Sequence, residues 1–228
     1  MSPWLVKRFR SGPAMAAYAA GLLRGALRRS RAAAFTVALP GGATPLRLFK
    51  ALTKSGLRWD RVHFFMSDER LVRTSAPGSN FGQARRLLFS KIRIPRGNLH
   101  PVGRGKPAAA AAAYEKELKR TAGKEGKLDL VFLGLGPDGH TASLFPGSPA
   151  PGKSWELVAP ALAPAGAAPR LRVTLTPGAI NRAKLVVLMA AGPEKAGVFG
   201  LAAAGEKKIP AGSLRPRGKY YLLFSEVR

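Results

Sequence analysis

The chain has 228 residues, 46% of them hydrophobic, and it contains no cysteine. This length and composition are typical of a globular chain with one buried core, so we expect a single domain over residues 1–228. The lack of cysteine excludes disulfides, thiolate metal sites and cysteine nucleophiles. No apolar run approaches the roughly 18 residues of a membrane-spanning helix, so we expect no membrane contact.

The charge is strongly positive, because 38 Lys and Arg against 12 Asp and Glu give a net charge of +26. Such a field attracts polyanions, and we expect nonspecific binding to nucleic acids at low salt. The basic residues are spread from Lys7 to Arg228, without a basic tail or zinc-finger spacing. This even distribution favours a general excess of basic residues on the surface over a dedicated nucleic-acid interface. A nucleic-acid interface stays as the alternative. The N-terminal stretch does not fit a signal peptide, so we expect a cytoplasmic location.

Periodicity and turn residues predict alternating helices and strands. In the first half these are a helix at 13–31, a strand at 34–39, a helix at 45–54, a strand at 62–67 and a helix starting near 81. In the second half they are a helix at 108–121, strands at 128–135 and 171–175, a helix at 177–182, a strand at 185–190, a helix at 193–203 and a strand at 220–224. Loops are predicted at 68–80 and over the Pro/Gly-rich stretch 146–169. The order predicts an α/β fold: a single-domain, Rossmann-like, three-layer fold with a mostly parallel central sheet covered by helices on both faces.

Three loops directly follow predicted strands, and a parallel sheet places such loops together at the edge where these folds bind ligands. The first loop contains Gly41, Gly42 and Thr44, followed by Pro45. Its glycines let an anion approach the backbone, and the next helix presents N–H groups, so we predict a phosphate site; the alternative is an ordinary turn. Thr44 is expected to cap that helix, and Pro45 to occupy its first position.

The second loop carries Asp68 and Glu69, two of only twelve acidic residues, followed by Arg70. These carboxylates are candidates for acid–base work, for hydrogen bonds to sugar hydroxyls or for orienting Arg70. The alternative is a solvated loop with a surface ion pair, which contributes little to stability.

The third loop has the sequence GLGPDGHTASLFP over residues 134–146. Its glycines match GxGxxG, but Asp138 would place a carboxylate against a pyrophosphate and no crossover helix fits behind it, so we reject dinucleotide binding. What remains is His140 beside Asp138, because a histidine exchanges protons near neutral pH and an aspartate can orient it. Ser143 is not surrounded by the GxSxG motif of a serine hydrolase. The sequence contains no cluster of histidines that would predict a metal site.

The other two histidines are predicted to be structural. His63 falls within a predicted strand, as a packed or edge residue. His100 precedes Pro101 in a linker and is expected at the surface.

Together these motifs resemble the 6-phosphogluconolactonase family, part of a wider group that includes glucosamine-6-phosphate deaminase. The resemblance covers nearly the whole chain and rests on the three loops, on Ser79 and Asn80, and on the stretches 172–176 and 192–195. It implies hydrolysis of 6-phosphogluconolactone to 6-phosphogluconate without metal or cofactor. His140 would be the base that activates water, and Asp138 and Asp68 would hold the site and the sugar hydroxyls. The implied phosphate or carboxylate contacts are Arg70, Arg172 and Lys195, beside Gly41, Gly42 and Thr44.

The deaminase branch is the main alternative, because it shares the glycine-rich loop and the DGH element. Its members carry a glutamate before the proline of the third loop, where this chain has Phe145, and this difference favours the lactonase. The chain departs from the lactonase pattern at Pro40, where serine is common, and at Arg73, where proline is frequent. The oligomeric state stays open, with a monomer as the simplest expectation.

Overall fold

The computed structural model describes residues 4–227; residues 1–3 and 228, at the two ends of the predicted domain, lie outside the described residues. At its centre is a six-stranded sheet with the order β1-β9-β8-β5-β2-β3, in which all neighbouring strands are parallel. The strands are β1 (Leu5–Phe9), β2 (Phe35–Leu39), β3 (Val62–Met66), β5 (Leu130–Gly134), β8 (Leu185–Ala191) and β9 (Lys219–Ser225). The inner strands β2 and β8 are buried along their whole length, as is typical of a parallel sheet covered on both faces.

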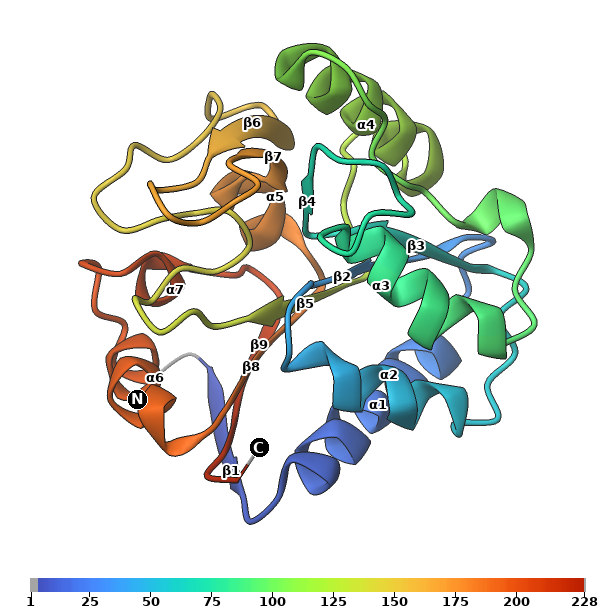
Figure 1. Ribbon diagram of the computed structural model, residues 1–228. Helices are drawn as coiled ribbons and strands as arrows, with labels where there is room; N and C mark the ends of the chain where they lie inside the picture. Colours follow the sequence, from blue (N-terminus) through green and yellow to red (C-terminus); the bar gives the residue numbers. More distant parts are fainter. Residues whose placement is uncertain (1–3, 228) are drawn as a thin grey trace.

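Helices cover both faces of this sheet (Figure 1). One face packs against α1 (Gly12–Arg29), α2 (Pro45–Thr53) and α3 (Asn80–Leu87). The other packs against α4 (Pro107–Ala122), α5 (Pro177–Arg182), α6 (Ala196–Ala204) and α7 (Pro210–Ser213). Side chains alternate between the two cores along β5, with Leu130 and Phe132 in the first and Val131 and Leu133 in the second. The predicted three-layer α/β fold is therefore confirmed.

A small antiparallel sheet lies beside the large one (Figure 1), with the order β4-β7-β6. Its strands are β4 (Asp68–Arg70), β6 (Val158–Leu162) and β7 (Leu171–Leu175). The predictions of uninterrupted loops at 68–80 and 146–169 are wrong, because β4 and β6 lie within them. β4 is only three residues long and polar, and β6 contains Pro160, which is tolerated because β6 is an edge strand. Pairing with β7 stabilises both strands, and a local pattern does not show such pairing.

Most other elements fall where the sequence predicts them, and β7 and α5 have the predicted bounds. The predicted helix at 193–203 consists of a 3₁₀ helix, Pro193–Lys195, followed by α6. Two further 3₁₀ helices, Phe89–Lys91 and Arg96–Asn98, connect α3 to the following segment. The strand β1 and the short α7 were not predicted; β1 is mostly exposed, lies at the edge of the sheet and, within residues 4–227, pairs with β9 alone.

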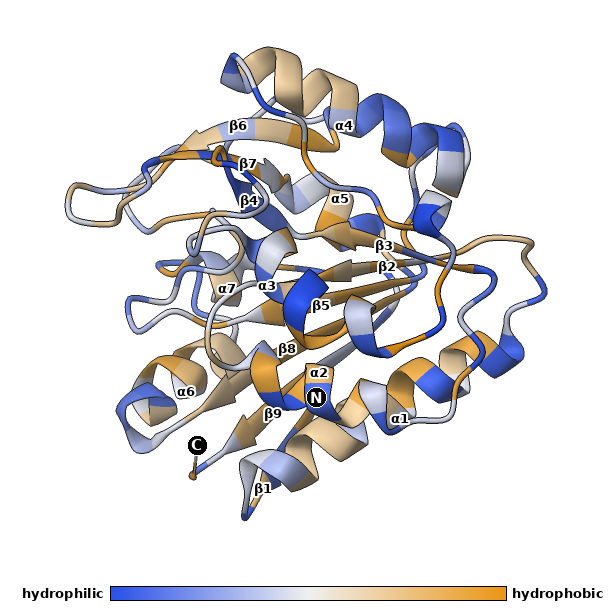
Figure 2. Cartoon of the chain, turned by 45° about the vertical axis from the view of Figure 1, so that its right-hand side comes forward, coloured by the Kyte–Doolittle hydropathy of each residue, from blue (hydrophilic) through white to orange (hydrophobic). Residues whose placement is uncertain are grey.

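Hydropathy follows the layered arrangement (Figure 2). The helix α4 changes from an alanine-rich first half to a charged second half, and its buried positions, such as Tyr114 and Leu118, belong to the second core. No helix within residues 4–227 is long and apolar enough to cross a membrane.

Candidate active site

A cavity of about 210 Å³ lies where β2 and β5 end, next to the small sheet. It is lined by Pro40, Gly41, Gly42, Ala43, Thr44, Asp68, Arg70, Asn80, Gly134, Leu135, Gly136, Pro137, His140, Ala142, Arg172 and Lys195. The structure thus brings together residues of all three loops, as expected of loops at the carboxyl ends of neighbouring parallel strands. Of the nine predicted site residues, Asp138 alone is absent from this lining.

The glycine-rich loop lies against the start of α3. A Cβ at Gly41 would overlap the side chain of Asn80, and Gly42 has a φ of +93°. Both positions therefore require glycine. Pro45 occupies the first turn of α2, as predicted, but Thr44 makes no side-chain cap bond and has helical backbone angles. The prediction of a Thr44 cap is wrong, and its side chain lies at the cavity instead.

Asp68 and Glu69 serve different parts of the structure, because consecutive residues of a strand point to opposite faces. Glu69 is 3% exposed and accepts hydrogen bonds from the backbone N–H groups of Arg70, Asn80 and Phe81 and from the hydroxyl of Ser79. Burial raises the pKa of the Glu69 carboxyl, and these four bonds oppose that shift. Glu69 therefore holds the start of α3 against β4, and only Asp68 faces the cavity.

Three residues surround the Asp68 carboxylate, which is 7% exposed. Its Oδ2 accepts a hydrogen bond of 2.7 Å from the Ser143 hydroxyl and lies 3.8 Å from a guanidinium nitrogen of Arg172. Its Oδ1 accepts a bond of 3.2 Å from Asn80 Nδ2. The hydroxyl of Ser143 is thus engaged by Asp68 while His140 pairs with Asp138, which argues against a serine nucleophile.

Arg70 and Arg172 lie directly opposite each other on the antiparallel strands β4 and β7. Like charges in this arrangement repel, and burial, followed by the charge of Arg70, lowers the pKa of Arg172. Backbone carbonyls hold both side chains: Arg70 donates to Gly78, and Arg172 donates to Pro169 and Ala167. The repulsion makes this pair a favourable place for an anion.

Lys195 adds a third cation from the loop after β8. Its Nζ donates a hydrogen bond of 2.7 Å to the carbonyl of Leu135, which anchors it beside the third loop. The cavity lining therefore carries three fixed cations, Arg70, Arg172 and Lys195, and one carboxylate, Asp68. A small ligand with more than one negative charge is complementary to this lining.

His140 lies at the rim of the cavity, with its side chain 34% exposed. Its Nδ1 is 2.5 Å from Asp138 Oδ1, and the same oxygen accepts the backbone N–H of His140 at 3.1 Å. A neutral imidazole that donates its Nδ1–H to this carboxylate keeps Nε2 as a proton acceptor. Gly136 permits the arrangement, because a Cβ there would overlap the imidazole ring.

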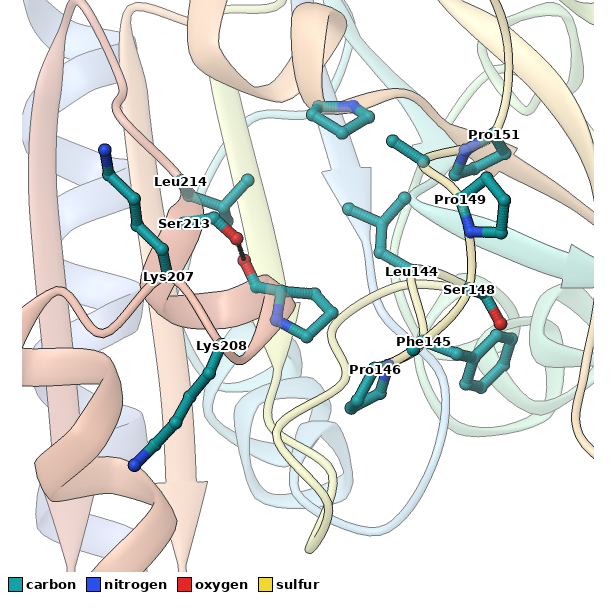
Figure 3. Close-up of a pocket in the computed structure, with 14 residues that line it drawn as sticks. Leu144, Phe145, Pro146, Ser148, Pro149, Pro151, Lys207, Lys208, Ser213 and Leu214 are labelled. Carbon is teal, nitrogen blue, oxygen red and sulfur yellow. Dashed lines mark hydrogen bonds between the residues drawn. The ribbon is translucent and has the colours of Figure 1, made fainter.

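Phe145 lies between His140 and a second cavity. Its ring is 5.2 Å from the imidazole, centroid to centroid, and it lines a cavity of about 320 Å³ (Figure 3). Figure 3 shows the prolines of the segment after Phe145 on one side of this cavity, and Lys207 and Lys208 extending in opposite directions on the other side. Phe145 is 8% exposed, so an apolar ring fills the position at which a resemblance to the deaminase branch would imply a glutamate.

The remaining two histidines lie together, away from the cavity lining. His63 is on the edge strand β3, as predicted, but the prediction of a surface position for His100 is wrong, because it is 4% exposed. The His100 ring stacks on Phe65 and bonds to His63 at 3.0 Å and to Glu117 at 2.8 Å. Burial lowers the pKa of His100 to about 4. Among the described residues, no cluster of three or more His, Cys, Asp or Glu could hold a metal ion.

A cationic cavity at the carboxyl edge of a parallel sheet, with a histidine and a carboxylate at its rim, defines an α/β enzyme for a small anionic substrate. The family model described as "Glucosamine-6-phosphate isomerases/6-phosphogluconolactonase" matches residues 11–222. The chain belongs to this family.

Relatives and solved structures support the same placement. The chain is 38% identical over 200 residues to the 6-phosphogluconolactonase of Synechocystis sp., covering 84% of this chain and 82% of that protein. It is 39% identical over 160 residues to the 6-phosphogluconolactonase of Thermotoga maritima, covering 70% of each. The crystal structure of that Thermotoga protein has a TM-score of 0.84 at 29% identity, covering 97% of this chain and 99% of the other. A monomeric glucosamine-6-phosphate deaminase has a TM-score of 0.82 at 16% identity, a likeness that concerns the fold alone.

Proposed function

We propose that the chain catalyses the reaction for which these relatives are named, the hydrolysis of 6-phospho-D-glucono-1,5-lactone to 6-phospho-D-gluconate, the second step of the oxidative pentose phosphate pathway. The observation that carries the proposal is the His140–Asp138 pair at the rim of a cavity with three cations. Such a pair supplies a positioned base, and the cations suit a phosphorylated substrate.

In the proposed reaction, His140 Nε2 takes a proton from water while the water oxygen bonds to the lactone carbonyl carbon, C1. The resulting tetrahedral oxyanion collapses, the bond between C1 and the ring oxygen breaks, and the ring oxygen leaves with the proton from the imidazolium. Asp138 fixes the ring and stabilises the imidazolium, and Asp68 holds sugar hydroxyls. General base catalysis of this kind contributes typically ~10²–10⁴-fold. No step requires a metal or an organic cofactor.

We assign the phosphate to the cationic side of the cavity. Arg70, Arg172 and Lys195 supply the charge there, and Gly41, Gly42 and Thr44 form the adjacent loop at the start of α2. Arg172→Gln should raise KM for the lactone about 10- to 100-fold, because a charge-assisted hydrogen bond contributes roughly 1.5–3 kcal/mol. An unchanged KM would place the phosphate elsewhere.

A deaminase activity is the second candidate, because the family description includes it. Amine release from an aminosugar needs an acid in the third loop, and the buried Phe145 offers none. The structural likeness to a deaminase carries no substrate information at 16% identity.

Four further expectations belong to the proposal. Residues 1–228 form one domain, which is supported by the packing of both sheets on the second core. A monomer remains the simplest expectation, and we expect a cytoplasmic location because a chain without cysteine needs no oxidising environment. Its charge gives only nonspecific polyanion binding, so anisotropy of labelled duplex DNA should show no binding above roughly 0.15 M salt. Binding that persists there would favour a dedicated nucleic-acid function.

The decisive experiment measures hydrolysis of freshly generated 6-phosphoglucono-δ-lactone in chelator-treated buffer, above the spontaneous rate. The wild type should accelerate hydrolysis, and His140→Ala should lose most of the acceleration. His63→Ala is the matched control, because His63 lies outside the cavity lining. A wild type without acceleration would refute the proposed function, whereas equal losses in both histidine variants would refute the role of His140.

A further inference from the structure

Asn80 is a buried cavity residue whose amide is only half used. It is 2% exposed, begins α3 and lines the cavity. Its Nδ2 donates to the backbone carbonyl of Asp68 at 2.8 Å and to Asp68 Oδ1 at 3.2 Å. Its Oδ1 is buried and has no hydrogen-bond partner.

The orientation of this amide is fixed by its neighbours. Exchanging Nδ2 and Oδ1 would place the amide oxygen against the backbone carbonyl oxygen and Oδ1 of Asp68. A carbonyl oxygen and an ionised carboxylate oxygen accept hydrogen bonds but cannot donate them. The acceptor therefore faces away from Asp68, on the side where it meets Gly41 of the glycine-rich loop. Only a glycine fits at position 41 beside this oxygen, since a Cβ there would overlap it, and both residues line the cavity.

A second unpartnered buried atom belongs to the same cavity, Nε of Arg70. A buried polar atom without a partner is costly, so two such atoms at one cavity are candidates for hydrogen bonds to a ligand. An unused cationic donor needs an anion, and an unused neutral acceptor needs a hydroxyl or N–H donor. A phosphorylated sugar derivative carries both, an anion at one end and hydroxyl donors along the ring.

We propose that Asn80 Oδ1 accepts a hydrogen bond from one ring hydroxyl of the substrate, and that Asn80 thereby determines the specificity for fully hydroxylated lactones. This assignment rests on the proposed lactonase function. Asp68 shares the task, because Asn80 and Ser143 hold its carboxylate at the same side of the cavity. A lactone without the matching hydroxyl leaves the Asn80 acceptor unpaired in the complex, and such mismatches are strongly disfavoured.

The test compares 6-phosphoglucono-δ-lactone with its 2-deoxy, 3-deoxy and 4-deoxy analogues, each freshly prepared by oxidation of the corresponding hexose 6-phosphate. For the wild type, kcat/KM should fall about 10- to 100-fold for the analogue that lacks the recognised hydroxyl. Asn80→Ala should lose a similar factor on the parent lactone and lose nothing further on that one analogue. Such non-additivity identifies a direct contact.

Two variants distinguish recognition of the substrate hydroxyl by Asn80 from the hydrogen bonds with which Asn80 holds Asp68 in place. Ser143→Ala removes a hydrogen bond to Asp68 without removing the Asn80 acceptor, so it should retain the preference for the hydroxylated lactone even where it lowers kcat/KM. Asn80→Asp keeps the acceptor oxygen but sets a second oxygen against the two oxygens of Asp68, so its rate should fall while the preference for the hydroxylated lactone is retained. Thermal unfolding of each variant shows whether it is folded.

The outcomes are distinct. If the wild type hydrolyses the parent and all three deoxy lactones equally well, or if Asn80→Ala lowers all four rates by one factor, the assignment to Asn80 is overturned while the lactonase function stands. If the wild type hydrolyses no lactone, the proposed function fails and the assignment fails with it.

Discussion

The substitution Gly136→Ala tests whether the position of the His140 ring sets the rate. Gly136 has no positive φ, so its backbone accepts alanine. A Cβ at this position would overlap Nδ1 and Cε1 of His140 and would lie 2.7 Å from Asp138 Oδ1. Because ordinary contacts of carbon with heavy atoms lie near ~3.5 Å, the imidazole must shift by more than about 1 Å or swing out of its pair with Asp138.

Gly136→Ala is expected to lower kcat much more than it lowers the free energy of unfolding. A misplacement of about 1 Å lowers rates by roughly 10²-fold, so kcat for lactone hydrolysis should fall by about that factor. The His140 side chain is partly exposed, so the lost hydrogen bond to Asp138 should reduce the free energy of unfolding by no more than about 1 kcal/mol.

The assay is the initial rate of lactone hydrolysis, together with urea denaturation of the same preparations. Gly103→Ala is the matched control, because nothing lies within 4 Å of a Cβ at that loop position, and it should change neither quantity. Full activity in Gly136→Ala would refute the reasoning, since it would mean that the His140–Asp138 geometry does not set the rate.

Three further predictions concern folding and specificity. Because His100 has a pKa of about 4 in the folded protein against an ordinary value of 6.5, the unfolded chain binds the proton first, and stability should fall as the pH drops from 6.5 to 4. The loss should be at most about 3 kcal/mol by denaturation at each pH, and His100→Phe should flatten the dependence; an equal slope in both proteins would contradict this cause. Glu69→Ala leaves four donors, three of them in buried hydrogen bonds, without their acceptor and should cost about 2–4 kcal/mol of stability in urea, whereas a loss under roughly 0.5 kcal/mol would show that the buried carboxylate is dispensable. Phe145→Glu should release no ammonia from glucosamine 6-phosphate, because we expect several residues to distinguish the two branches; measurable release would contradict that view.

Local sequence was sufficient for much of the framework. The periods of the apolar residues predict the inner strands and most helices, because buried strands and amphipathic helices carry their own patterns. Glycine and proline mark the loops after β2 and β5, where the structure requires those residues: Gly41 and Gly42 leave room and turn the chain, and Gly136 accommodates the His140 ring. His140 and Asp138 are two residues apart, so their pairing was also within reach of the sequence.

Tertiary structure alone decided how the polar residues of the three loops are paired around the cavity. The short strand β4 exists because it pairs with β7, and this pairing places Arg70 opposite Arg172 and separates Asp68 from Glu69. No local signal marked Asn80 as the residue with an unused acceptor, because that depends on contacts with Asp68 and Gly41, which are distant in sequence. His100 is buried for the same reason, since Phe65 and Glu117 cover it from other elements. Local patterns record the period of a segment, whereas burial and pairing depend on segments that only the folded chain brings into contact.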